Sequence, residues 1–116
     1  MYELNVEILN NMEIVNEFWF EKLSFCSCGD PYSQLRLIRD VLNIVYKQHE
    51  IEDNIMDINM DETIFEFVMN VLDTNDVVEH GSNIRCGWMT DYGEKLRNAL
   101  NDLTDEQLND FMIVNN

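Results

Sequence analysis

Residues 76–96 read DVVEHGSNIRCGWMTDYGEKL and carry turn, strand and helix signals in direct succession. A pair of valines favours a first strand, His-Gly-Ser-Asn favours a turn, and residues 84–89 favour a return strand. Thr90 or Asp91 can cap a following helix, because either side-chain oxygen accepts hydrogen bonds from first-turn amides. The stretch therefore predicts a β-hairpin that runs directly into a helix. Alternation along the return strand would place one set of side chains on a common face: Ile84, Cys86 and Trp88.

The length and composition predict one folded domain over residues 1–116. A chain of 116 residues suits a single domain, and 46% hydrophobic residues suffice for a core. The sequence contains no apolar run long enough for a membrane span and no basic start followed by an apolar segment. We therefore expect a cytoplasmic protein, in the host cell if a phage encodes it.

The N-terminal segment supports two interpretations. Residues 2–9 alternate apolar and polar side chains, which suits a strand, but apolar residues from 4 to 23 also recur at helical spacing. We favour a helix that begins near residue 4 and is buried on two sides, with Trp19 in the core. In the alternative, one of the three consecutive aromatic residues 18–20 is exposed and marks a protein contact or a dimer surface.

Helical spacing predicts further helices at about 31–48, 61–72 and 104–112. Asp30 before a proline is a start signal, Asn59 or Asp61 can cap the second helix, and Thr104 with Gln107 has capping-box spacing. The expected buried residues of the first of these helices are Leu35, Ile38, Val41, Leu42 and Val45, and those of the second are Ile64, Phe65, Val68, Val71 and Leu72. The predicted fold class is mainly α (α+β), a compact helical domain with one β-hairpin.

Charge is the strongest compositional feature. The chain has 23 acidic residues against 7 Lys and Arg, a net charge of −16, and no Lys or Arg lies between Lys47 and Arg85. Such a surface repels nucleic acid and anionic membranes and attracts basic protein surfaces. The alternative is that the excess acid serves solubility. The residues predicted to form a partner-binding face are Asp57, Asp61, Glu62, Glu66, Asp73, Asp76 and Glu79.

Residues 88–96, WMTDYGEKL, follow the predicted hairpin and start the next helix. With the preceding helix, residues 61–100 resemble the wing and following helix of winged-helix proteins, which often read Leu-Thr-x-x-Gly-x-x-Leu here. The resemblance implies a winged-helix-like C-terminal half and DNA binding through a recognition helix and the wing. The chain departs from that pattern, because the helix at 61–72 carries only acidic charges. A DNA-binding regulator would need a dimer and a basic patch from Arg36, Arg39, Lys47, Arg85, Lys95 and Arg97.

Metal binding and catalysis have weaker sequence support. A Cys₃His zinc site would require two loops to meet and bring together Cys26, Cys28, His80 and Cys86, but the spacing is not a standard one. We expect these cysteines to be reduced and to be small buried residues. No recognisable catalytic constellation is present in the sequence, so we expect a non-enzymatic protein with no cofactor and no catalytic residues.

We therefore expect a small acidic binding protein that docks on a basic surface of a larger protein. The chain also resembles small phage and prophage proteins, so a phage anti-defence (anti-CRISPR-like) inhibitor or a nucleic-acid mimic is the favoured form. We expect no direct contact with nucleic acid or membrane. The alternatives are a winged-helix transcriptional regulator and a small structural or assembly protein, and a homodimer is compatible with each.

Overall fold

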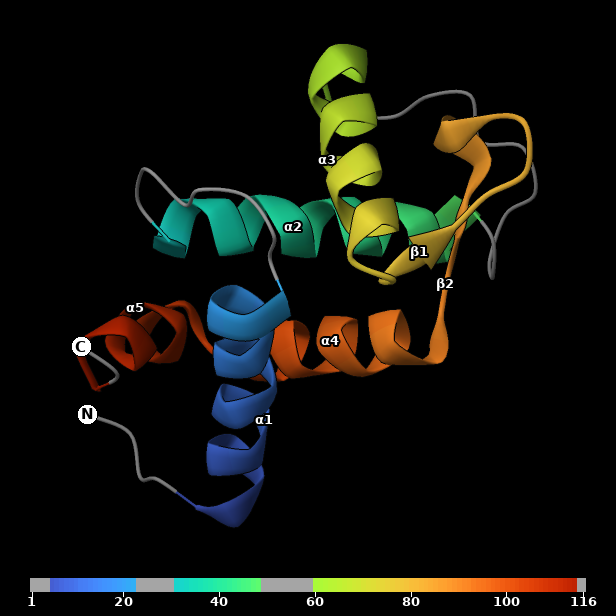
Figure 1. Ribbon diagram of the computed structural model, residues 1–116. Helices are drawn as coiled ribbons and strands as arrows, with labels where there is room; N and C mark the ends of the chain where they lie inside the picture. Colours follow the sequence, from blue (N-terminus) through green and yellow to red (C-terminus); the bar gives the residue numbers. More distant parts are fainter. Residues whose placement is uncertain (1–4, 23–30, 49–59, 115–116) are drawn as a thin grey trace.

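The computed structural model describes residues 5–22, 31–48 and 60–114, with side chains described within 5–21, 32–48 and 60–109. The order of elements is helix, helix, helix, hairpin, helix, helix (Figure 1). The elements are α1 (Val6–Glu17), the π-helical turn η1 (Phe18–Lys22), α2 (Pro31–Tyr46), α3 (Glu62–Thr74), β1 (Val78–Glu79), the 3₁₀ turn η3 (Ile84–Cys86), β2 (Trp88–Met89), α4 (Asp91–Asp102) and α5 (Asp105–Val114). This arrangement confirms the predicted mainly α fold class with one small hairpin.

Side-chain caps begin most of these helices. Asn5 accepts a hydrogen bond from the Ile8 amide at 2.8 Å and caps α1, which begins at Val6. The N-terminal segment is therefore helical from residue 6, as the favoured interpretation expects. Asp61 caps α3 and Thr90, rather than Asp91, caps α4, each through an amide 3.0 Å away. Each such cap stabilises its helix by about 1 kcal/mol.

The predicted capping box of α5 is present. The Gln107 side-chain oxygen accepts from the Thr104 amide at 2.8 Å, and the Thr104 hydroxyl accepts from the Gln107 amide at 3.1 Å. The reciprocal pair satisfies two helix-end donors and fixes where α5 begins.

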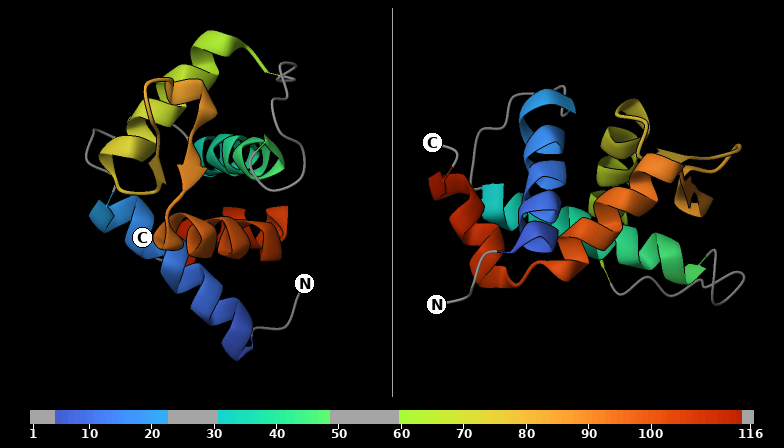
Figure 2. Two further views of the ribbon diagram at one scale, coloured as in Figure 1. Left: turned by 90° about the vertical axis from the view of Figure 1, so that its right-hand side faces the viewer. Right: turned by 90° about the horizontal axis from the view of Figure 1, so that it is seen from below.

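The core lies where α1, α2, α3 and α4 cross. In both figures α2 packs against α4, while α1 crosses α4 and α3 crosses α2 (Figures 1 and 2). Every apolar residue predicted for the stripe of α2 is buried. The buried hydrophobic residues are Met12, Val15, Phe18, Trp19, Leu35, Ile38, Val41, Leu42, Val45, Phe65, Val68, Met69, Leu72, Val77, Val78, Leu96, Ala99, Leu100, Leu103 and Leu108. No helix among the described residues has the length and apolar character needed to cross a bilayer.

The burial predicted for α3 is partly wrong. Ile64 is exposed and Val71 is only half-buried, whereas Met69 is fully buried. The buried positions of α3 follow a spacing of i, i+3, i+4 and i+7 from Phe65, and Ile64 lies at the edge of that stripe. The spacing of the apolar residues along α3 does not by itself show which of them pack against the core.

The return strand is shorter than predicted. Only Trp88 and Met89 pair with β1, in the register Val78 to Met89 and Glu79 to Trp88, and residues 84–86 form the 3₁₀ turn η3. The Asn83 side chain accepts from the Arg85 amide at 3.0 Å, and this local hydrogen bond competes with strand pairing. Trp88 and Cys86 are exposed, so the expectation that Cys86 is a buried residue is wrong.

The start of α4 is bonded to the end of α3 through the backbone of residues 76 and 77. The Val77 carbonyl accepts from the Thr90 amide at 3.0 Å, and the Thr90 hydroxyl donates to the Asp76 carbonyl at 2.6 Å. Gly93, one turn into α4, faces the same carbonyl so closely that an added Cβ would overlap the Val77 oxygen. Glycine at position 93 is therefore a steric requirement of this contact.

The substitution Gly93→Ala is expected to destabilise the protein by about 3 kcal/mol, because the new methyl group must push α4 away from Val77. Urea unfolding followed by circular dichroism would measure the change. Gly81→Ala is the matched control, since nothing lies within 4 Å of a Cβ at that position. Equal stability of the two variants would contradict the proposed steric role.

Candidate functional site

The N-terminal half of α3 presents carboxylates to the turn η3. The Glu62 carboxylate lies 2.6 Å from the Arg85 guanidinium, and the Glu66 carboxylate lies 3.7 Å from it. Both glutamates remain well exposed, at 65% and 45% of the side chain. Such surface pairs contribute little stability, about 0–1 kcal/mol. Arg85 thus reduces the negative charge at this end without burying either acid.

The C-terminal end of α3 contacts the hairpin turn. The His80 Nε2 atom lies 3.5 Å from the Asp73 carboxylate, and His80 Nδ1 lies 2.6 Å from the Gly81 carbonyl. These contacts hold the turn against the helix. Asp73 thus has one contact within the protein while its side chain stays 43% exposed.

A shallow groove next to this turn collects further carboxylates. Asp76, Glu79 and Asp91 line it, together with Met89, Thr90 and Tyr92. Asp76 is brought there by a left-handed backbone conformation, with φ of 61°, which reverses the chain after α3. A non-glycine residue tolerates this conformation at a cost of about 1 kcal/mol, and Asp and Asn tolerate it best. The sequence indicates Asp91 only as a possible helix cap, because no local pattern links it to Asp76.

The predicted partner-binding residues fall into separate groups. Asp57 lies outside the described residues. Asp61, Glu62 and Glu66 lie at the first turns of α3, whereas Asp73, Asp76 and Glu79 lie at or beyond its other end. The 13 residues of α3 span roughly 20 Å. The structure therefore spreads these acids along an edge formed by α3 and the hairpin, which we call the acidic edge: Asp61, Glu62, Glu66, Asp73, Asp76, Glu79 and Asp91.

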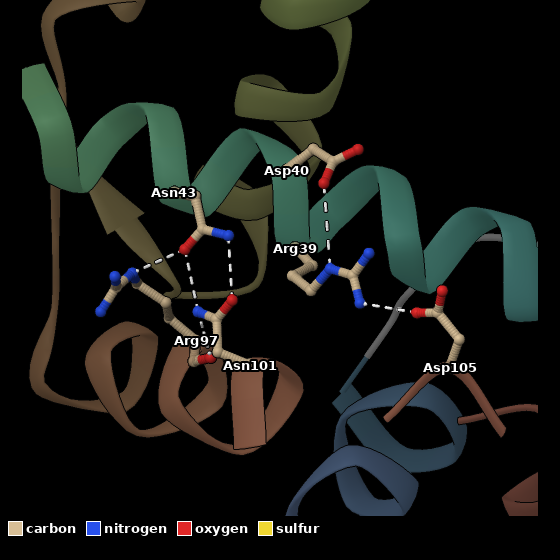
Figure 3. A network of polar contacts seen from close by, with 6 residues as sticks. All are labelled: Arg39, Asp40, Asn43, Arg97, Asn101 and Asp105. Carbon is tan, nitrogen blue, oxygen red and sulfur yellow. Dashed lines mark hydrogen bonds and ion pairs between the residues drawn. The ribbon is translucent and has the colours of Figure 1, made fainter. Parts of the chain in front are cut away.

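The cations are used elsewhere in the fold. Arg39 lies 3.1 Å from the Asp105 carboxylate and 3.8 Å from that of Asp40, so it joins α2 to α5 (Figure 3). Arg97 donates to Asn43 at 2.9 Å and stacks 3.9 Å from the centre of the Tyr46 ring, so it joins α4 to α2. These arginines serve helix packing.

Asn43 and Asn101 complete this network. Their side-chain amides exchange hydrogen bonds of 3.0 and 2.8 Å across the α2–α4 interface (Figure 3). Of the cations named for a basic patch, Arg36, Lys47 and Lys95 remain exposed. The described structure thus disperses the basic residues over α2, η3 and α4.

The candidate zinc ligands are not brought together in the described part of the chain. Cys26 and Cys28 lie outside it, Cys86 is exposed, and His80 contacts Asp73 and Gly81. Among the described residues no group of three or more His, Cys, Asp and Glu could hold a metal ion. The expectation that the protein binds no metal stays a prediction.

Tyr92 lies between the acidic edge and α1. Burial raises the pKa of its hydroxyl, and the nearby Glu17 carboxylate raises it further, to about 12. A second shallow groove, between α1 and α4, is lined by Glu17 and by Asn10, Glu13, Ile14 and Lys95. Tyr92 therefore stays neutral in the folded protein at all physiological pH values.

Replacement of Glu17 by Gln is expected to lower the pKa of Tyr92 from about 12, because the repulsion of tyrosinate by the carboxylate is lost. Ultraviolet titration, with Tyr92→Phe subtracted, would isolate this hydroxyl. Glu13→Gln is the control.

Since the folded-state pKa of Tyr92 exceeds the unfolded value of 10.0, the stability contributed by Tyr92 is complete below pH 10.0 and is lost as pH rises to about 12. Ionisation of Tyr92 near the ordinary tyrosine pKa of 10.0 would contradict this prediction.

Comparison of the chain with protein-family models, with curated proteins and with solved structures finds no match. The fold therefore defines the protein only as a mainly α domain with a short antiparallel hairpin. The winged-helix resemblance stays a prediction, as does the single-domain extent over residues 1–116.

Proposed function

We propose that this protein is a non-enzymatic binding protein whose acidic edge docks on a basic surface of a larger protein. The proposal rests on how few ion pairs the carboxylates of the acidic edge make with described cations of the protein itself. No described cation lies within ion-pair distance of Asp61, Asp76 or Glu79, and Arg85 contacts Glu62 and Glu66 without burying them. These carboxylates can accept cations from a partner at little cost in internal contacts.

The physical consequence is electrostatic steering. A protein of net charge −16 attracts basic surfaces over roughly 10 Å at about 0.1 M salt and over longer distances at lower salt. Surfaces that ordinarily hold nucleic acid are basic, so a nucleic-acid enzyme is the favoured partner class. Occupation of such a surface would block it, which is the action of a phage anti-defence inhibitor or nucleic-acid mimic inside the host cytoplasm.

A winged-helix regulator is the second proposal, and the order α3, hairpin, α4 favours it. Two observations weigh against it. The helix in the recognition position carries acids and no base, and Arg39 and Arg97 are engaged between helices. A specific gel shift on genomic DNA at low salt would favour the regulator over the acidic binder.

Charge reversal tests the primary proposal. The triple variant Glu62→Lys, Glu66→Lys, Glu79→Lys is expected to abolish capture of the partner from extract of the source cells, measured by quantitative mass spectrometry. These positions avoid the cap at Asp61, the His80 contact of Asp73 and the left-handed backbone at Asp76.

The matched control is Glu13→Lys, Glu21→Lys, Asp102→Lys, which changes the net charge equally at exposed positions on α1, η1 and α4. We expect the control to retain capture. Capture by the wild type should also weaken steeply as salt rises, because exposed charges are screened. Equal loss in both variants would indicate a net-charge effect, and insensitivity to salt would refute the proposal.

Removal of Arg85 should have the opposite effect to charge reversal. In Arg85→Gln the carboxylates of Glu62 and Glu66 lose their internal partner, so binding to the captured protein is expected to strengthen roughly two- to fivefold. Titration calorimetry would measure the dissociation constant. Arg36→Gln on α2 removes the same charge away from the acidic edge and should leave affinity nearly unchanged. Weaker binding of Arg85→Gln would contradict this role.

A further inference from the structure

One side of α3 carries a row of carboxylates that faces the hairpin turn. With about 100° of rotation per residue, Glu62, Glu66 and Asp73 fall within about 40° of one another around the helix. We call these three residues the α3 acid row. The Arg85 Nη2 atom lies 2.6 Å from the Glu62 carboxylate, and the Arg85 Nε atom lies 3.7 Å from that of Glu66. His80 lies 3.5 Å from the Asp73 carboxylate, so one short segment contacts the whole row.

The segment 80–86, which we call the strap, has few contacts with the rest of the fold. Every residue of the strap is described by the structure, and none is buried. Ile84 is half-buried and packs against the core. The hydrogen bonds from Asn83 to the amides of Arg85 and Cys86 lie within the strap itself. The strap is therefore held on α3 by Ile84 and by surface ion pairs, and segments with so few buried contacts open most easily.

Both ends of the strap are fixed. β1 ends at Glu79 and β2 begins at Trp88, and these two residues pair across the hairpin. Gly87, between the strap and β2, is packed so closely that an added Cβ would lie 2.7 Å from the Glu79 carbonyl oxygen. Opening is therefore confined to the strap, and Ile84 is the residue that would leave the core.

The Arg85 guanidinium contacts two carboxylates that lie one helical turn apart. Separate nitrogens of one planar group face Glu62 and Glu66, whereas a lysine ammonium presents its donors from a single point. The pairing is incomplete, because the buried Arg85 Nε atom makes no hydrogen bond with the described part of the chain. The α3 acid row therefore suits a guanidinium, and Arg85 does not use its full hydrogen-bonding capacity.

We propose that the strap is an autoinhibitory contact, in which Arg85 occupies the position on the α3 acid row that an arginine of the partner takes when the strap opens. The inference rests on the proposed function and specifies how access to its carboxylates is regulated. Surface ion pairs contribute little stability, so Arg85 can be exchanged. A guanidinium that arrives with the partner gains two carboxylates and repels Arg85 from them.

Trypsin cleavage between Arg85 and Cys86 measures strap opening, because the protease must take the Arg85 side chain into its own pocket. Cleavage of a transiently opened segment follows the population of the open form. The double variant Glu62→Gln, Glu66→Gln is expected to raise the cleavage rate by about fivefold, since the loss of a surface ion pair shifts the opening equilibrium by up to that factor.

The matched control is Glu13→Gln, Glu21→Gln, which removes the same charge from exposed positions of α1 and η1 and should leave the rate unchanged. Cleavage after Lys95 requires α4 to unfold, so its rate reports any loss of global stability. Arg85→Lys keeps both the charge and the trypsin site. Relative to the same bond in a short peptide, its cleavage should rise about twofold or more, because an ammonium contacts the two carboxylates less well.

The outcomes separate the two proposals. An unchanged rate in Glu62→Gln, Glu66→Gln overturns the strap, whereas loss of capture in the triple Lys variant would still support the acidic edge. An equal rise in the α1 and η1 control, or after Lys95, also overturns the strap, because the change would then be general. If the strap opens but Arg85→Gln binds the partner no more tightly than Arg36→Gln, the autoinhibitory role is overturned. If capture is insensitive to salt and to the triple Lys variant, the proposed function fails and the autoinhibitory role fails with it.

Discussion

The fold depends on one close backbone contact, between the Val77 carbonyl and the first turn of α4. Thr90 donates to that carbonyl from its amide, and Gly93 lies against the same oxygen with no room for a side chain. Since Val77 also donates to the Leu72 carbonyl at 2.9 Å, the end of α3 and the start of α4 are fixed to each other through one residue.

A polar interface performs the corresponding task farther along α4, between that helix and α2. Arg97 reaches Asn43 and the Tyr46 ring, while Asn43 and Asn101 bond to each other, so α2 and α4 are aligned in register above their buried leucines and valines (Figure 3). Hydrogen bonds between amides fix orientation where apolar packing alone would permit sliding. Arg39 and Arg97, two of the seven Lys and Arg residues, are thus committed to helix packing.

The use of Arg39 and Arg97 in helix packing leaves fewer cations beside the surface carboxylates. The acids along α3 and the hairpin meet Arg85 and His80 as their described internal partners, and the remaining carboxylates face solvent together with Phe67. Glu62 and Glu66 lie on the side of α3 that faces η3, whereas Ile64 and Phe67 are exposed on another side of the same helix.

The sequence by itself determined what local chemistry controls. The caps at Asp61 and Thr104, the α2 stripe from Leu35 to Val45 and the mainly α class follow from hydrogen-bonding side chains and 3.6-residue periodicity, which need no distant partner. The tertiary structure alone decided the rest. Asp91 joins Asp76 in one groove, Asn83 replaces most of the return strand with a turn, and Ile64 faces solvent. The groove depends on how closely α4 approaches Val77, and the exposure of Ile64 on which side of α3 packs on the core, whereas the Asn83 turn is a local hydrogen bond that outcompetes strand pairing.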